Sequence, residues 1–406
     1  MLEETLMIMN PWWSEEYRAP GIERENYLKK IDEELGKSRA LFIFGLRRVG
    51  KTTIMKQYIS KKLESFGRKH ILFASLDHPE IENTSIIELL RTFRRMNSLD
   101  RKEDVMLFLD EVQHRTGFER EIKAIVDSDP HVWILGSGSS SSVIRHRSAA
   151  LTGRYRKIQV KPLSFEEFLK FKGKNVDLTQ PHLMEAYLED YLRSGGMPEY
   201  VLTKDVQVLI NLVEDIIYKD IAGNYGIREP KLLKDLFLLL MERVGKPMTY
   251  SKLSRILGVG VDSIRRYIAY FEEIYLIDIV EMFGSPNVRK RAPRKVYVAD
   301  TGIKVAFSGG RNMGSLAENL SYLMLKERCD VYYYLYERGE VDFICRDSAI
   351  EVKYMDEIED EDLDALKSLR LRGIKNKILI TRREKDVQGV KTTPLWKLSL
   401  NGSQSL

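Results

Sequence analysis

Residues 41–53 read LFIFGLRRVGKTT, and this stretch decides the fold of the first part of the chain. The apolar run 41–44 predicts a buried strand, and the amphipathic residues 52–66 predict a helix after the glycine-containing turn. Residues 45–52 match the pattern G-x-x-x-x-G-K-[ST] at every fixed position, in the strand–loop–helix context that the pattern requires. Such glycines let backbone N–H groups surround phosphate oxygens at the positive end of a helix. The stretch therefore predicts a nucleotide-binding α/β domain.

The side chains of this loop have separate expected roles. Lys51 can reach the β- and γ-phosphates, and the Thr52 hydroxyl is a ligand for Mg²⁺. The residues that we expect to contact the nucleotide are Gly45, Arg47, Arg48, Val49, Gly50, Lys51, Thr52 and Thr53.

The second half of the predicted site is the run VMLFLDE at residues 105–111. An apolar strand that ends in two acids is typical of a Walker B element. Asp110 would hold Mg²⁺ through water, and Glu111 would polarise the attacking water as a general base. Paired acids after a strand are also common as caps or surface residues, but the phosphate-binding loop earlier in the chain favours the catalytic interpretation.

A third apolar strand, at residues 132–135, ends in the serine-rich run GSGSSSS. Because ligands bind at the carboxyl ends of such strands, Ser137 or Ser139 could bond the γ-phosphate or the lytic water; a plain serine loop is the alternative. Arg154, in LTGRY, could act on the γ-phosphate of its own chain or of a second copy in a homo-oligomer. A surface salt bridge is the alternative for Arg154.

Composition sets outer limits on the function. The 406 residues are 43% hydrophobic and 31% charged, which excludes global disorder. The net charge of +5 is too small to indicate nucleic-acid binding by itself. No apolar run approaches the ~20 residues of a membrane helix, and the start lacks the features of a signal peptide. Two cysteines are too few for a disulfide framework or a cysteine-rich zinc site, so we expect a cytoplasmic protein.

Strands alternating with helices predict a parallel sheet in the first part of the chain, followed by further modules. We predict four segments: a P-loop core at 1–165, a helical lid at 166–230, a winged helix-turn-helix at 231–300, and a second α/β domain at 301–406.

The predicted winged helix has helices at 231–244, 251–257 and 262–273, and wing strands at 276–282 and 295–298. The wing tip, within 284–295, holds five basic residues and no acid, which suits contact with DNA phosphates. A lid or spacer with a solvated basic loop is the alternative. On the last helix we expect Ser263, Arg265, Arg266 and Tyr267 to face outward. The expected nucleic-acid contacts are Arg265, Arg266, Arg289, Lys290, Arg291, Arg294 and Lys295.

Carboxylates gather in the last part of the sequence. Glu318 lies on a predicted helix, and the strands around Asp342 and Glu351 are joined by a connection short enough for a hairpin. These three residues could hold a second Mg²⁺ or Mn²⁺ that activates water, with Lys353 stabilising the nucleophile or the transition state. A Glu-x-Lys pair alone is a weak signal, because exposed strands are rich in both residues.

Several motifs occur in an order that resembles archaeal P-loop ATPases related to AAA+ and STAND proteins. They are NPWW at 10–13, GLRRVGKTT, FLDEVQ, GSGSSS followed by LTGRY, KPLSFEEFL, and GGMPEY at 195–200. The resemblance implies ATP and Mg²⁺, a sensor role for Ser137 or Ser139, a γ-phosphate role for Arg154, and a helper role for Gln113. In some relatives ATP acts as a slowly hydrolysed switch.

The pattern Glu318…Asp342…Glu351-x-Lys353 resembles the PD-(D/E)xK restriction-endonuclease-like fold, with Val341 in place of the proline. The whole chain resembles archaeal ATPases that carry such a C-terminal domain. We therefore expect a Mg²⁺-dependent ATPase that couples its nucleotide state to DNA binding, and the sequence leaves open whether the C-terminal domain also cleaves DNA. The alternative is a nucleotide switch whose nuclease-like domain is inactive and binds a partner or nucleic acid.

Overall fold

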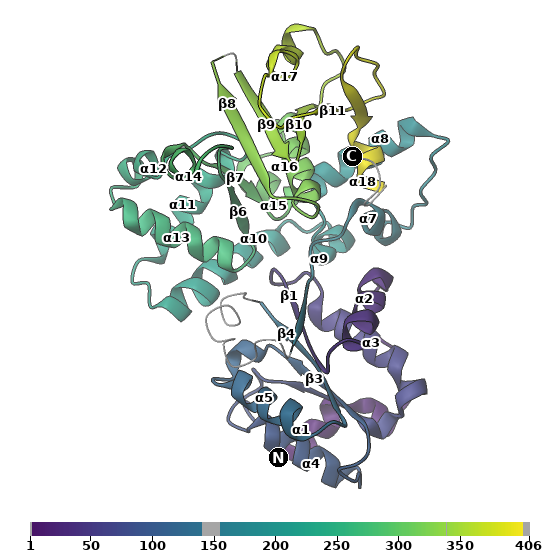
Figure 1. Ribbon diagram of the computed structural model, residues 1–406. Helices are drawn as coiled ribbons and strands as arrows, with labels where there is room; N and C mark the ends of the chain where they lie inside the picture. The colour runs from purple at the N-terminus through teal and green to yellow at the C-terminus, as the bar shows by residue number, and fades with distance from the viewer. Residues whose placement is uncertain (1, 140–154, 338, 401–406) are drawn as a thin grey trace. The chain divides into compact units, whose positions relative to one another are not determined.

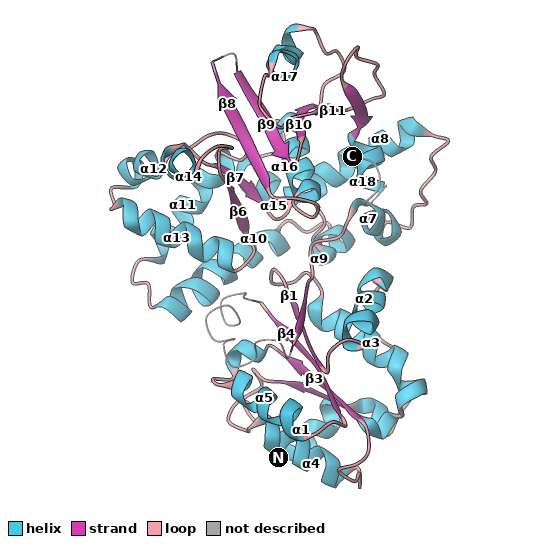
Figure 2. Ribbon diagram, viewed as in Figure 1, coloured by secondary structure: helices cyan, strands magenta, loops and turns pink. Residues whose placement is uncertain are grey.

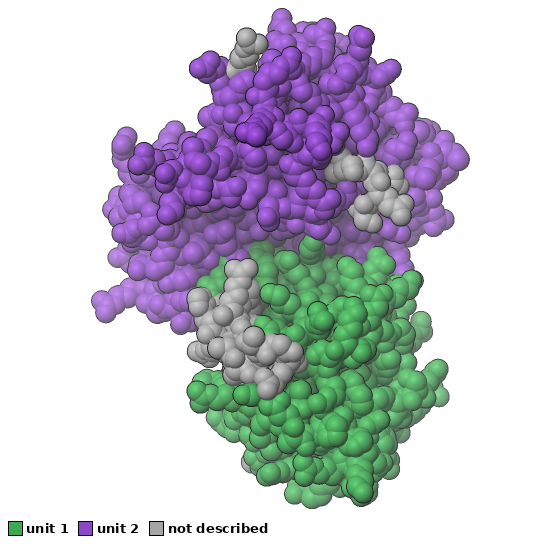
Figure 3. Space-filling view, viewed as in Figure 1, with its two compact units in different colours: residues 1–161, 273–275 green, residues 162–272, 276–406 purple. Residues whose placement is uncertain are grey.

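The computed structural model describes residues 2–139, 155–337 and 339–400, and it divides into two compact units (Figure 3). Unit 1 comprises residues 1–161 and 273–275, and unit 2 comprises residues 162–272 and 276–406. The boundaries that the sequence predicts at 230 and 300 lie inside unit 2 and stay predictions. In the described part of the chain, no helix is both long and apolar enough to cross a membrane.

Unit 1 is built on a five-stranded parallel sheet, which confirms the α/β prediction. Its strand order is β2-β3-β4-β1-β5. Four strands lie where apolar runs predict them, whereas β5 was not predicted because its sequence RKIQ has a single apolar residue. The strands are β1 (Ala40–Phe44), β2 (Ile71–Ser75), β3 (Val105–Asp110), β4 (Val132–Gly138) and β5 (Arg156–Gln159).

Helices cover both faces of this sheet (Figures 1 and 2). One face packs against α1, α4 and α5 in a continuous apolar core that includes Phe42 and Leu107. On the other face, Tyr58 and Phe66 of α3 contact Phe108 and Trp133, with ring centroids 6.1 Å apart in each pair. The helices are α1 (Leu2–Met9), α2 (Glu25–Leu35), α3 (Lys51–Phe66), α4 (Ile86–Met96) and α5 (Phe118–Ser128).

The NPWW motif covers the free edge of the sheet at β2. The Asn10 side chain donates to the Phe73 carbonyl at 2.9 Å and accepts from the Phe73 N–H at 2.6 Å, as a neighbouring strand would. The indole N–H groups of Trp12 and Trp13 both donate to the Ile71 carbonyl. An exposed strand edge invites pairing with other chains, so this segment has a structural role.

Unit 2 begins with helices and then forms a two-stranded ribbon. The three helices and two strands predicted between 231 and 298 are present as α11, α12, α13, β6 and β7, and the two strands pair antiparallel. The elements up to this point are α7 (Phe165–Phe171), α8 (Pro181–Ser194), α9 (Pro198–Thr203), α10 (Gln207–Asp215) with a π-helical continuation (Ile216–Gly223), α11 (Pro230–Glu242), α12 (Tyr250–Leu257), α13 (Val261–Glu273), β6 (Ile277–Val280), α14 (Pro286–Arg291) and β7 (Lys295–Val298).

Two local predictions for this region are wrong. The basic segment between β6 and β7 is not an extended hairpin tip, because residues 286–291 form the short helix α14. A proline at the first helical position, preceded by an extended serine, favours this helix start. On α13, Tyr267 is buried, with only 9% of its surface exposed, and does not face outward.

The last part of unit 2 is a mixed sheet of order β12-β11-β10-β9-β8. Strands β8, β9 and β10 pair antiparallel, and β10, β11 and β12 pair parallel. Helix α17 contributes Leu366 to the apolar core on one face, and Tyr322 of α16 contacts Phe343 of β9 at 6.4 Å. The elements are α15 (Thr301–Ser308), α16 (Met313–Leu325), β8 (Val331–Tyr336), β9 (Gly339–Cys345), β10 (Ser348–Lys353), α17 (Asp364–Ser368), β11 (Asn376–Thr381), β12 (Lys391–Pro394) and α18 (Leu395–Leu400).

The GGMPEY segment is packed too closely for side chains at its glycines. A Cβ atom at Gly195 would lie 2.1 Å from Oδ1 of Asp300, and one at Gly196 would lie 2.3 Å from the Leu163 carbonyl. Asp300 also accepts hydrogen bonds from the backbone N–H groups of Gly196 and Ile303, so it joins this segment to the start of α15. The motif therefore has a structural explanation.

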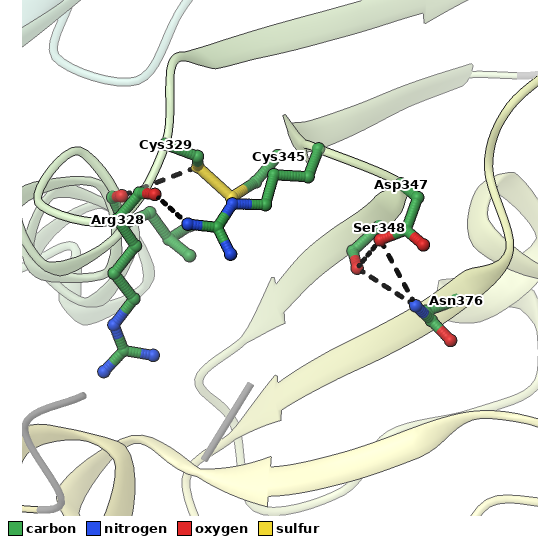
Figure 4. The surroundings of a disulfide bond; sticks show 8 residues. Arg328, Cys329, Cys345, Asp347, Ser348 and Asn376 are labelled. Atoms are coloured by element: carbon green, nitrogen blue, oxygen red, sulfur yellow. Dashed lines mark hydrogen bonds between the residues drawn. A yellow bond between two sulfur atoms is a disulfide. The ribbon is translucent and has the colours of Figure 1, made fainter. Parts of the chain in front are cut away.

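A disulfide bond joins Cys329, just after α16, to Cys345 at the end of β9 (Figure 4). The two Cα atoms are 5.8 Å apart. Beside it, the Arg346 guanidinium donates to the Arg328 carbonyl at 2.6 Å. The cysteine count, from which we expected no disulfide framework, gave no indication of this pair.

Replacing Asn10 with alanine should destabilise unit 1 by about 2 to 3 kcal/mol, because it leaves the Phe73 N–H and C=O groups buried without partners. Urea denaturation followed by tryptophan fluorescence measures this change. The control is Asn97→Ala, which removes a single half-buried bond to the Phe93 carbonyl and should cost less than about 1 kcal/mol. Equal losses in the two variants would contradict the edge-covering role.

Candidate functional site

The phosphate-binding loop connects β1 to α3, and its two glycines are needed for different reasons. A Cβ atom at Gly45 would lie 2.0 Å from the Val160 carbonyl oxygen, so only glycine fits beside the chain that follows β5. Gly50 has open space around it, but its φ of +94° is a conformation that favours glycine. Helix α3 starts directly after Gly50 and points its free N–H groups toward the loop.

Lys51 is buried at the start of α3, with 5% of its surface exposed. Its ammonium group donates to the carbonyls of Gly45 and Leu46, at 3.0 and 3.1 Å. The ammonium is therefore enclosed by the same loop that the motif predicts to surround phosphates.

Asp110, at the end of β3, is brought together with Thr52 and Ser137. The Thr52 hydroxyl donates to Oδ2 of Asp110 at 2.7 Å, and the Ser137 hydroxyl donates to Oδ1. Burial raises the pKa of Asp110, and the hydrogen bonds from Ser137 and Thr52 oppose that rise. A hydroxyl and a carboxylate at one point form an oxygen-only donor set, which fits Mg²⁺.

Glu111 follows Asp110 in a left-handed backbone conformation with φ of 52°. Its carboxylate accepts a hydrogen bond from the Gln113 amide, which also donates to the Ser139 hydroxyl at 3.2 Å. Gln113 thus links the predicted general base to the serine loop after β4.

Arg24 and Tyr27 support the loop and were missed from the sequence. The Arg24 guanidinium is buried and donates to the Val49 and Lys161 carbonyls, at 3.0 Å each. The Tyr27 hydroxyl accepts from the Lys161 N–H at 3.0 Å. These residues lie before and within α2, where no motif marks them, so nothing local in the sequence could have identified them.

The other predicted nucleotide contacts belong to the same short loop or to the start of α3. Val49 is buried, Arg47 and Thr53 are half-buried, and Arg48 is exposed with a left-handed φ of 62°. Arg154 lies outside the described residues, so its predicted role on the γ-phosphate stays a prediction.

In unit 2, the predicted carboxylates Asp342, Glu351 and Glu318 lie close together. Lys295, which the sequence predicts to contact nucleic acid, lies among them. Asp342 and Glu351 are cross-strand neighbours: the Val352 N–H donates to Asp342, and the Asp342 N–H donates to Glu351. The Lys353 ammonium lies 3.2 Å from Glu351.

Lys295 lies among these carboxylates. It is fully buried, and its ammonium contacts Glu318 at 2.9 Å, Asp342 at 3.6 Å, and Glu340. The prediction that Lys295 contacts nucleic acid is therefore wrong, because its charge is enclosed by carboxylates.

Burial is the largest influence on the titration of this cluster. It raises the pKa of Glu318 to about 7, and the nearby Asp342 carboxylate adds to this rise. Burial and Asp342 also raise the pKa of Glu351 well above its ordinary value. Lys295 and Lys353 oppose these shifts by favouring the ionised carboxylates. The cluster is thus a buried network of opposite charges.

The remaining predicted nucleic-acid contacts differ in their exposure. Arg289 stacks over the Tyr332 ring at 4.2 Å, and Arg294 lies over the Tyr250 ring at 5.0 Å, so both are partly buried. The exposed members of the set are Arg265 and Arg266 on α13, and Lys290 and Arg291 on α14.

Comparisons with known proteins agree with the geometry of unit 1. Residues 37–169 match the family described as AAA domain, and residues 185–313 match a domain of unknown function. An uncharacterized protein of Methanocaldococcus jannaschii, MJ1544, is 27% identical, over 92% of this chain and 90% of its own length. An uncharacterized protein of Haemophilus influenzae is 26% identical, over 89% of this chain and 93% of its own length.

Among solved structures, the Walker-type ATPase PABY2304 of Pyrococcus abyssi is similar with a TM-score of 0.44 and 14% identity, over 73% of this chain and 99% of that chain. The AAA match and the arrangement of Lys51, Thr52 and Asp110 lead to one conclusion. The chain contains a P-loop ATPase domain of the AAA type, whose chemistry is nucleotide binding and hydrolysis.

Glu111→Gln should retain ATP binding and lower the turnover number about 100-fold or more, because glutamine cannot accept the proton of the attacking water. Steady-state phosphate release and equilibrium binding of ATP measure the two effects separately. The matched control is Glu88→Gln, an exposed residue on α4, which should leave both unchanged. Unchanged turnover in Glu111→Gln would remove Glu111 from the mechanism.

Proposed function

We propose that this protein is a Mg²⁺-dependent ATPase that uses its nucleotide state to control DNA binding by unit 2. The observation that carries the ATPase part is the contact between Thr52 and Asp110 beside the enclosed ammonium of Lys51. When bound there, Mg²⁺ would neutralise phosphate charge. Glu111 would take the proton of the attacking water, and Gln113 would hold Glu111 in place.

Two features support DNA as the partner of unit 2. Helices α11 to α13 and the β6–β7 ribbon occur in the order of a winged helix, which commonly binds DNA. Exposed basic residues lie on α12, α13 and α14, and Figure 1 shows α12 next to α14. The Arg294 guanidinium, which follows α14 in the chain, lies 5.0 Å from the ring centroid of Tyr250, the first residue of α12. These exposed residues are Lys252, Arg255, Arg265, Arg266, Lys290 and Arg291.

A second candidate function is favoured by the carboxylate cluster. The PD-(D/E)xK resemblance predicts a metal-dependent nuclease site at Asp342 and Glu351. The buried ammonium of Lys295, however, already neutralises part of the negative charge of that cluster. A nucleotide switch whose C-terminal domain binds DNA or a partner without cutting is the candidate that this observation supports. Cleavage of DNA that depends on Mn²⁺ and is lost in Glu351→Ala would instead establish the nuclease.

DNA affinity of the wild-type protein should change when Mg²⁺ and ATP are added, and Lys51→Ala should abolish this change, because the variant loses the ammonium that contacts the phosphates. Fluorescence anisotropy of labelled DNA measures both proteins. A control titration with ADP distinguishes nucleotide binding from turnover. A wild-type affinity that is the same with and without ATP would refute the coupling.

Replacing Lys290 and Arg291 together with glutamine should lower DNA affinity and reduce the slope of log affinity against log salt by about 2, one unit for each lost phosphate contact. The charge-matched control is Arg372→Gln with Lys375→Gln, a second exposed pair in unit 2. Both measurements use the anisotropy assay over a range of NaCl concentrations. Identical slopes in the two double variants would exclude α14 from the DNA-binding surface.

A further inference from the structure

The carboxylate cluster of unit 2 is arranged around an ammonium group. Lys295 on β7 has no exposed surface, and its Nζ atom lies 2.9 Å from Oε1 of Glu318 and 3.6 Å from Oδ1 of Asp342. Oε1 of Glu340 is a third contact. Carboxylates from a helix and from strand β9 thus converge on one positive charge.

Three further carboxylate oxygens of the cluster have protein partners. Oδ2 of Asp342 accepts from the Val352 N–H at 2.9 Å. Oε1 of Glu318, which already contacts Lys295, also accepts from the Tyr297 hydroxyl at 2.6 Å. The two oxygens of Glu351 contact the Lys353 ammonium and the Asp342 N–H.

The cluster also has little room for a further ion. A Cβ atom at Gly245 would lie 2.7 Å from Oε2 of Glu318, so the backbone closes the site on that side. A divalent cation needs several oxygen ligands at about 2.0 to 2.6 Å, and here it would stand beside a buried positive charge. Within residues 2–139, 155–337 and 339–400, no group of three or more His, Cys, Asp or Glu side chains is placed to hold a metal ion. The residues as they lie do not fit a second metal.

We propose that Lys295 is the resident cation of this cluster and that its ammonium takes the place of a divalent metal ion. The ammonium contacts Glu318, Glu340 and Asp342 and offsets part of their negative charge from within the protein, and the wild-type cluster does not recruit Mg²⁺ or Mn²⁺. Removing the ammonium leaves carboxylates that face one another across a vacated space, which is the donor set that hard cations prefer. Lys295→Met keeps most of the side-chain volume and removes the charge.

Binding of Mn²⁺ tests this assignment, with free Mn²⁺ counted by electron paramagnetic resonance. The full chain is used without nucleotide and with Asp110→Asn, so that the phosphate site contributes no ion. The parent protein in this test is the full chain with Asp110→Asn alone, and it should bind no Mn²⁺ with a dissociation constant below about 1 mM. Adding Lys295→Met to this parent should create a site for one Mn²⁺ ion per chain, with a dissociation constant of about 0.1 mM or lower. Adding Glu318→Gln to Lys295→Met should remove the gained ion.

Two outcomes would overturn the proposal. One is a parent that binds an Mn²⁺ ion and loses it on Asp342→Asn, which would show a metal site compatible with Lys295. The other is a folded Lys295→Met protein, by circular dichroism, that gains no ion. If the Lys295→Met protein does not fold, the parent is compared with the same protein carrying Asp342→Asn. An Mn²⁺ ion that the parent binds and the Asp342→Asn protein does not bind refutes the proposal. A parent that binds no Mn²⁺ ion supports it. None of these measurements of Mn²⁺ binding depends on DNA binding or on ATP turnover.

Discussion

The nucleotide site depends on one close approach of backbone to backbone. Gly45 lies directly against the Val160 carbonyl, where a side chain would be 2.0 Å from the oxygen. Because the chain after β5 runs so close, Arg24 can join the loop carbonyl at Val49 to the carbonyl at Lys161. The loop is therefore held from both sides before any phosphate arrives. Preorganised donors of this kind stabilise charge without further rearrangement.

In unit 2 a comparable constraint comes from electrostatics. The Lys295 charge comes from β7, and its partners Glu318, Glu340 and Asp342 come from α16 and β9. Removing one member of such a network leaves a buried charge without compensation, which typically costs about 3 to 5 kcal/mol. The ribbon and the C-terminal sheet therefore stabilise each other, which agrees with their place in one compact unit. A boundary at residue 300, as predicted from the sequence, would cut through this network.

The features that could be predicted from the sequence are those that a short stretch of residues specifies by itself. The strand–loop–helix of residues 41–53 and the acids after β3 were identified because each motif carries its own structural context, and the hairpin prediction brought Asp342 close to Glu351. Strand β5 was not predicted, because it has one buried residue in four. Arg24 acts only through contacts with distant segments, so no pattern of neighbours could reveal it. For α14 a local signal exists in Ser285 and Pro286, but the basic composition of the segment favours a solvated loop.

The environment of Lys295 could not be predicted from its neighbours in the sequence. In the sequence it closes a run of basic residues, and composition predicts that such a run is solvated. The strand β7 turns it inward, however, and its four residues are all buried. A Glu-x-Lys pair on β10 can then be read in two ways, since the same carboxylates can surround a metal ion or an ammonium group. Which cation they hold is decided by a side chain from another strand, so the chemistry of the C-terminal domain follows from the tertiary fold and not from the motif.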